Sequence, residues 1–157
     1  MAVILNIETA SKYCSIAVLA EDKIFYEKKS SVGQSHSSIL GIFVKDALEK
    51  LKICEKSLDA VAVSSGPGSY TGLRIGASLA KGLCFGLSIP LIAVPTLKIL
   101  AAAGLNALKT DENRNSLIVC PMLDARRMEV YSALYDADLN EIRPAMAEII
   151  DEKSYTC

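Results

Sequence analysis

The residues best suited to chemistry lie in a glycine-rich segment, 65–76, which reads S-G-P-G-S-Y-T-G-L-R-I-G. A strand, a glycine loop and a helix N-terminus in succession form a candidate anion site, because backbone N–H groups can point at a phosphate. The spacing differs from the phosphate-binding motif G-x-x-x-x-G-K-[ST], since five residues separate Gly66 from Gly72 and Leu73 follows where that motif has lysine. Two interpretations stay open: a phosphate cradle, or a tight structural turn that positions the next helix.

Few other side chains offer catalytic chemistry. His36 is the one histidine of the chain, so the sequence has no metal motif with two histidines, and a histidine near a helix start is typical of a capping or surface residue. The segment D-A-R-R-M-E contains Asp124, Arg126 and Glu129. These residues either act in catalysis or belong to a hairpin turn held by local ion pairs and hydrogen bonds. We predict no catalytic, cofactor-binding or metal-binding residue.

The composition narrows the function classes. The chain is 51% hydrophobic and 22% charged, which supports a buried core and excludes a disordered tail or a coiled coil. A net charge of −1 argues against a stand-alone nucleic-acid binder, because such proteins normally carry a basic face. The first residues read as a strand, without the basic region of a signal peptide, and no apolar run approaches the ~20 residues of a membrane-spanning helix. We expect a soluble, cytoplasmic protein.

The elements that position the candidate residues follow from the periodicity of the apolar side chains. Helical spacing predicts a first helix that begins at one of the serines 35–38, a second that runs from an N-cap at Thr71 to about Leu87, and a third over 97–108. The polar residues 109–115 have the composition of a linker. Apolar and β-branched stretches predict strands at 3–8, 14–20, 24–29, 60–63, 91–94, 117–123 and 129–135, with a further strand opening at 149–150. This order indicates an α/β fold.

The first two predicted helices carry more apolar surface than one sheet can bury. In the second helix, small residues recur every four positions from Gly72 to Cys84 and form a ridge against which another helix can pack closely. In the first helix, Ile39 and Ile42 lie outside the main apolar face and would stay at the surface of a monomer. Packing within the chain alone is the alternative. We predict a partner interface that includes Ile39, Ile42, Phe43, Leu73, Gly76, Ala80 and Leu83.

Three segments of the chain resemble the TsaB (YeaZ) family: I-L-N-I-E-T-A near the start, the glycine-rich segment, and P-M-L-D-A-R-R-M-E-V-Y. Their order and spacing also match, and the resemblance covers essentially the whole chain. Glu8 stands where the family usually has Asp, so a carboxylate persists with a longer side chain. The residues that match the family motifs are Glu8, Gly66, Pro67, Gly68, Ser69, Thr71, Gly72, Arg74, Gly76, Asp124, Arg126 and Glu129.

The resemblance implies an ASKHA fold (actin, Hsp70, sugar kinase; ribonuclease H-like) and a role in forming N6-threonylcarbamoyladenosine in tRNAs that read codons beginning with A. In that pathway a TsaC-type enzyme makes threonylcarbamoyl-AMP and a TsaD-type subunit transfers the group to tRNA. A TsaB-type protein is then a non-catalytic scaffold that supports TsaD together with a TsaE-type ATPase, and it meets tRNA indirectly through the complex. Family members pair with TsaD, or with themselves as homodimers, through the first two helices.

The resemblance also implies two lobes: a complete N-terminal lobe over 1–112, and a second lobe that begins at 113 and is truncated after Cys157. An ASKHA nucleotide site needs two glycine-rich hairpins, because backbone N–H groups must approach the phosphates. The corresponding hairpins here, at 8–15 and 124–127, contain no glycine. We therefore expect no independent ATP binding. A peptidase-like enzyme and a degenerate ASKHA nucleotide-binding enzyme are the alternative functions.

Overall fold

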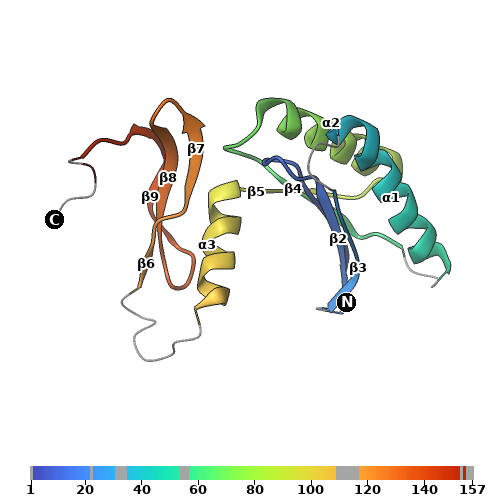
Figure 1. Cartoon of the computed structure of the whole chain (residues 1–157). Coiled ribbons are helices and arrows are strands. Elements are labelled where there is room, and N and C mark those ends of the chain that lie inside the picture. The colour runs from blue at the N-terminus through green and yellow to red at the C-terminus, as the bar shows by residue number, and fades with distance from the viewer. Residues whose placement is uncertain are drawn as a thin grey trace. The chain divides into compact units, whose positions relative to one another are not determined.

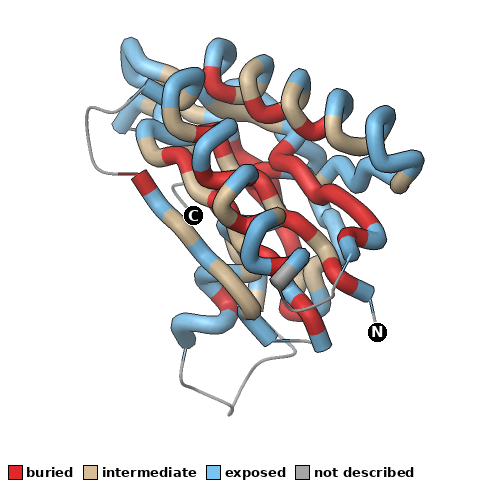
Figure 2. The backbone as a smooth tube through the Cα atoms, turned by 90° about the vertical axis from the view of Figure 1, so that its right-hand side faces the viewer, coloured by how far each residue is buried: buried red, intermediate tan, exposed pale blue. Residues whose placement is uncertain are grey.

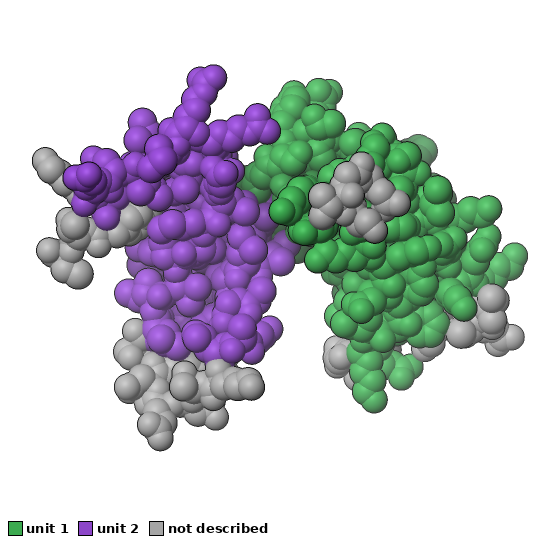
Figure 3. All heavy atoms as spheres, in the orientation of Figure 1, with its two compact units in different colours: residues 1–94 green, residues 95–157 purple. Residues whose placement is uncertain are grey.

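The chain folds into two compact units, Met1–Val94 and Pro95–Cys157, in a computed structural model (Figure 3). The structure describes residues 2–21, 23–30, 35–53, 57–108, 117–152 and 154. The lobe boundary that we expected between residues 112 and 113 and the linker expected at 109–115 lie outside these residues. Helix α3 (Thr96–Ala107), which we expected at the end of the first lobe, groups with the second compact unit.

A five-stranded sheet in the order β3-β2-β1-β4-β5 forms the first unit (Figure 1). The first three strands make an antiparallel meander, and β4 and β5 run parallel to β1. The predicted strands agree with the observed ones within one residue, because apolar side chains alternate along them as a half-buried sheet requires. The strands are β1 (Val3–Glu8), β2 (Ser15–Ala20), β3 (Lys23–Lys29), β4 (Ala60–Ser64) and β5 (Leu91–Val94).

Helices α1 (His36–Ile53) and α2 (Tyr70–Leu87) pack against this sheet. Buried and exposed positions alternate along both helices, so each buries one side and presents the other (Figure 2). We predicted Thr71 as the N-cap of α2, but the cap is Ser69, whose side-chain oxygen accepts a hydrogen bond from the Gly72 N–H at 3.2 Å. The shared core of helices and sheet includes Leu5, Ile7, Val18, Leu40, Val44, Leu51 and Ala80.

The second unit contains a four-stranded antiparallel sheet in which β8 pairs with each of the other strands. Helix α3 covers this sheet with Leu97 and Ala101, which pack with Ala133 and Tyr135 of β8 in a small buried cluster. The strands are β6 (Ile118–Val119), β7 (Met122–Arg126), β8 (Glu129–Asp136) and β9 (Glu141–Ile149).

Two strand predictions in the second unit were wrong. The single strand expected at 117–123 is divided into β6 and β7 at Cys120 and Pro121, where proline has no N–H to donate to a neighbouring strand. No strand begins at 149–150, because β9 already ends at Ile149. Strand β9 was not predicted. Most of its residues are exposed and it contains Pro144, so its sequence lacks the regular apolar alternation of a strand.

No helix within the described ranges combines the length and apolar character needed to cross a membrane. The described cysteines Cys14, Cys84 and Cys120 carry free thiols. Burial, with a smaller contribution from the Glu8 carboxylate, raises the pKa of the Cys14 thiol above its ordinary value. Cys14 is therefore held as a neutral thiol inside the first unit and packs as a small apolar residue.

Candidate functional site

The glycine-rich loop, residues 65–69, connects β4 to α2 and packs on the turn that follows β1. Gly66 and Gly68 have φ angles of 104° and 157°, which residues other than glycine rarely adopt. The peptide bond between Gly66 and Pro67 is cis. The Ser69 N–H donates a hydrogen bond to the Ala10 carbonyl oxygen at 2.6 Å. This bond joins the start of α2 directly to the β1–β2 turn.

Three glycines allow α2 to approach this turn closely. A Cβ atom would lie 2.6 Å from the Ala10 carbonyl oxygen if placed on Gly68, and 2.1 Å from the Thr9 carbonyl oxygen if placed on Gly72. On Gly76 it would lie 2.3 Å from the Thr9 hydroxyl oxygen. Because these distances exclude a side chain, the ridge of small residues on α2 faces its own chain. The contacts favour the tight-turn interpretation of the loop over the phosphate cradle.

The carboxylate of Glu8, the last residue of β1, stabilises the same turn. Its Oε1 atom accepts hydrogen bonds from the Ala10 N–H at 2.6 Å and from the Ser64 hydroxyl at 3.1 Å. Both backbone polar groups of Ala10 are therefore used within the chain, the N–H by Glu8 and the carbonyl by Ser69. Thr9 is fully buried beside these contacts, and its hydroxyl oxygen has no hydrogen-bond partner in the described structure.

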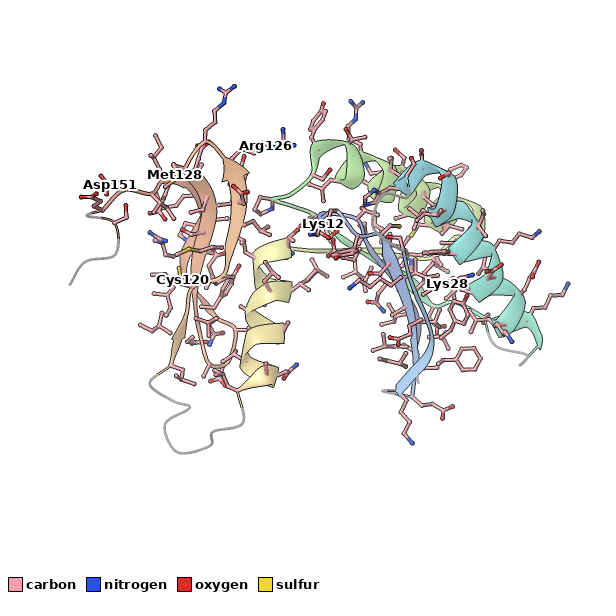
Figure 4. The ribbon with its side chains drawn as sticks, viewed as in Figure 1. Lys12, Lys28, Cys120, Arg126, Met128 and Asp151 are labelled. Atoms are coloured by element: carbon pink, nitrogen blue, oxygen red, sulfur yellow. The ribbon has the colours of Figure 1, made fainter. Side chains whose placement is uncertain are left out.

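His36, at the first position of α1, also holds the β1–β2 turn. Its Nε2 atom lies 3.1 Å from the Ser11 carbonyl oxygen and 3.2 Å from the Tyr13 carbonyl oxygen. Since both partners are acceptors, Nε2 carries the proton. The same turn carries Lys12, labelled in Figure 4, whose Nζ atom is 5.4 Å from the centre of the Tyr13 ring. We predicted a capping or surface histidine. His36 is partly exposed, and its side chain joins the start of α1 to the β1–β2 turn, which is a structural role.

The D-A-R-R segment forms the turn between β7 and β8, where Figure 4 labels Arg126 and Met128. The Arg126 N–H donates a hydrogen bond to Asp124 Oδ1 at 2.7 Å, and Arg126, Arg127 and Met128 have φ angles of 73°, 55° and 61°. The predicted hairpin is present with its hydrogen bond, but the described residues of the turn form none of the expected ion pairs. Nor do the described residues bring three His, Cys, Asp or Glu side chains together as a metal site would require.

The exposed sides of α1 and α2 enclose two hollows that meet at Leu79, and we call them the α1–α2 groove. The first, of about 380 Å³, has an apolar floor that includes Leu48 and Leu83 and a rim of Lys45, Glu49 and Lys52. The second, of about 550 Å³, lies between the apolar Ile75 and Leu79 and the polar side chains of Ser37, Tyr70, Thr71, Arg74 and Ser78.

The structure places the seven predicted interface residues in different environments. Ile42 is 56% exposed and Leu83 lines the groove, so both are available to a partner. Ile39 and Leu73 are half-buried. Phe43, Gly76 and Ala80 are buried in the core of the first unit, which removes them from any surface that a partner could contact.

Sequence reasoning missed the groove residues Tyr70, Ile75 and Leu79 and assigned Arg74 only to a motif. Tyr70 and Arg74 are four residues apart on one face of α2, and this spacing is the signal that could have identified them. Arg74 Nη1 donates a hydrogen bond to the Tyr70 hydroxyl at 3.2 Å, and its guanidinium carbon lies 5.3 Å from the centre of the Tyr70 ring. The pair forms a polar edge of the second hollow.

Salt bridges neutralise part of the charge on α1. Lys45 and Glu49, one turn apart, approach to 3.8 Å. Asp46 accepts a hydrogen bond from Lys28 of β3, labelled in Figure 4, and this bond raises the pKa of the Lys28 ammonium above its ordinary value. Lys52 and Arg74 have no carboxylate within ion-pairing distance among the described residues. The groove therefore combines an apolar floor with cations that are free to meet a partner.

Comparison with known proteins agrees with this architecture. Residues 27–156 match the family model described as TsaD: tRNA N6-adenosine threonylcarbamoyltransferase. The chain is 37% identical to the tRNA threonylcarbamoyladenosine biosynthesis protein TsaB of Bacillus subtilis, over 84% of this chain and 54% of that protein. It is 35% identical to the protein of the same name from Escherichia coli, over 88% of this chain and 57% of that protein. The chain thus spans a little over half the length of these curated relatives.

A solved structure resembles the whole fold. YeaZ from Pseudomonas aeruginosa superposes with a TM-score of 0.79 at 26% sequence identity, over 97% of this chain and 70% of that one. The resemblance extends across both compact units, since nearly the whole chain is covered. The chain therefore has an ASKHA-type α/β fold and belongs to the family that the TsaD model describes, in its TsaB (YeaZ) branch.

Proposed function

We propose that this chain is a non-catalytic, cytoplasmic partner subunit in the formation of N6-threonylcarbamoyladenosine in tRNAs that read codons beginning with A. In this proposal it binds a TsaD-type transferase through the α1–α2 groove, works with a TsaE-type ATPase, and meets tRNA through the complex. The names of the curated relatives support the pathway. The observation that carries the partner role is the groove itself, because an apolar floor edged by Tyr and Arg is typical of protein interfaces.

A charge placed beside the groove is expected to separate the complex. The full chain and the TsaD homologue of the same organism are co-expressed and examined by size-exclusion chromatography. Ile42→Glu is expected to weaken the complex at least ~10-fold, because a carboxylate at an exposed apolar position would lose its water on binding. Ile24→Glu is the matched control, since Ile24 is 61% exposed and lies on β3, away from the groove.

A complex that Ile42→Glu and Ile24→Glu leave equally intact would place the interface elsewhere. Absence of any complex with the wild-type chain would refute the partner role. The pathway is tested separately, by measuring N6-threonylcarbamoyladenosine in total tRNA by mass spectrometry from cells in which the chain is depleted and then restored. An unchanged level of the modified nucleoside would contradict the tRNA part of the proposal.

The non-catalytic part of the proposal is supported by the hydrogen bonds of backbone N–H groups in two hairpins, residues 8–15 and 124–127, which correspond to the phosphate-binding hairpins of ASKHA proteins. A phosphate bound at such a hairpin needs free N–H donors. The Ala10 N–H is bonded to Glu8, and the Arg126 N–H is bonded to Asp124. Titration calorimetry of the purified chain with ATP and Mg²⁺ is therefore expected to give no binding tighter than about 1 mM. Micromolar binding would instead favour the degenerate nucleotide-binding enzyme.

A further inference from the structure

We propose that the α1–α2 groove selects an acidic helix of a different protein over a second copy of this chain, with Arg74 and Lys52 as the contacts for that helix's carboxylates. The inference rests on the proposed partner role and adds the chemistry of the partner and a reason for its choice. It follows from the charges at the rim of the groove, the contacts that orient Arg74 and the symmetry of a self-associated pair.

The rim of the groove is positively charged, although the whole chain carries a net charge of −1. Among the described residues that line the two hollows are the cations Lys45, Lys52 and Arg74 and a single carboxylate, that of Glu49. Glu49 is already paired with Lys45 at 3.8 Å. The remaining two cations have no carboxylate partner in the described ranges. The positive excess is therefore local to the surface where a partner would dock.

Arg74 is held in a position from which it can meet a carboxylate. Its hydrogen bond to the Tyr70 hydroxyl uses one nitrogen, which leaves the other N–H groups of the guanidinium fork free. The fork lies at the edge of a hollow whose apolar part is Ile75 and Leu79. A matching surface presents an apolar side chain for these two residues and a carboxylate about one helical turn away. An amphipathic helix with acidic residues meets this requirement.

Self-association through the same groove would bring like charges together. In a symmetric dimer the same patch meets itself, so two surfaces with the same excess of positive charge come together. Juxtaposed like charges oppose a wrong partner and are a common source of specificity. Salt screens both interactions. Salt should therefore weaken the complex with an acidic partner and strengthen the homodimer.

The test uses the full chain and its TsaD homologue at 50 mM and 500 mM NaCl, with dissociation constants from biolayer interferometry and self-association from analytical ultracentrifugation. We expect the wild-type complex to weaken at least ~10-fold at the higher salt, and self-association to increase. Arg74→Glu should weaken the complex at least ~10-fold at 50 mM NaCl and reduce its salt dependence. Lys81→Glu, an exposed charge reversal on the same helix outside the groove, should have less than a ~3-fold effect.

The outcomes separate this inference from the proposed function. If Ile42→Glu disrupts the complex while Arg74→Glu and Lys81→Glu act alike, the partner role stands and the charge selection is overturned. Self-association that weakens with salt also overturns it, whether or not a complex with TsaD forms. RNA is the competing anion, so binding of the isolated chain to bulk tRNA is followed by fluorescence anisotropy. Micromolar tRNA binding that Arg74→Glu abolishes would assign the groove to RNA instead.

Discussion

Gly72→Ala is expected to destabilise the first unit by at least ~2 kcal/mol, or to prevent its folding. The new Cβ atom would lie 2.1 Å from the Thr9 carbonyl oxygen, far inside van der Waals contact. That oxygen belongs to the backbone of a turn that Glu8 and Ser69 hold through Ala10, so it cannot move aside without breaking hydrogen bonds. Overpacking in a close-packed interior costs about 1–3 kcal/mol and occasionally more, which outweighs the gain of about 1 kcal/mol that alanine brings inside a helix.

The same helix supplies the control. Gly82 is exposed, and apart from the adjoining residues and the backbone of its own helix, no described atom lies within 4 Å of the position that a Cβ would occupy. Gly82→Ala should therefore stabilise α2 by up to about 1 kcal/mol. Urea unfolding followed by circular dichroism gives the two free energies, and hydrogen exchange by mass spectrometry assigns the change to segments of β1 and α2. Equal stability of the two variants would show that α2 does not lie against the turn as described.

Tyr135→Ala is expected to cost the second unit about 3–5 kcal/mol, the range observed when a large buried ring is removed. Tyr135 is 1% exposed and is the largest fully buried side chain among the described residues. The other buried members of its cluster are Leu97, Ala101 and Ala133, so the ring supplies much of the apolar surface between α3 and β8. Two of these three residues are alanines, whose short side chains could not fill the cavity that loss of the ring would leave.

Two variants of β8 control this experiment. Tyr131 lies four residues before Tyr135 on the same strand but is 37% exposed, so Tyr131→Ala should cost only about 1 kcal/mol. Tyr135→Phe keeps the ring and should remain near wild type. Hydrogen exchange is the measurement, because it reports the β8 and α3 segments separately from β1 and β2. Similar loss of protection in Tyr131→Ala and Tyr135→Ala would contradict the packing described here.

The strands of the first unit could be predicted because their pattern is local. The alternation from Val3 to Glu8 determines which side chains face the core without knowledge of any distant residue. The helices could be predicted for the same reason. The predicted start of α2 was wrong by two residues. Ser69 caps the helix, and Thr71, which we predicted as the cap, lies within the helix and lines the groove.

The direction of the small-residue ridge on α2 could not be predicted from its spacing. A period of four residues shows that one face is small, but it does not say what covers that face. The answer lies in Thr9 and Ala10, which are more than fifty residues earlier in the chain and become neighbours only through the parallel pairing of β1 with β4. The interface prediction consequently included Gly76 and Ala80, which the structure buries, and omitted Tyr70 and Ile75 on the exposed side.

The close seating of α2 on the β1–β2 turn has a kinetic consequence for docking. The first two turns of α2 are held against the β1–β2 turn by the glycine contacts and by the bond from Ser69 to Ala10. The groove residue Arg74 lies within this anchored segment, and Leu79 follows less than one turn after it. The backbone of this part of α2 is in place before a partner arrives, so association requires little ordering of the backbone. Encounter is then limited by diffusion and orientation, at about 10⁵–10⁷ M⁻¹s⁻¹, and the lifetime of the complex is set by how readily the partner leaves.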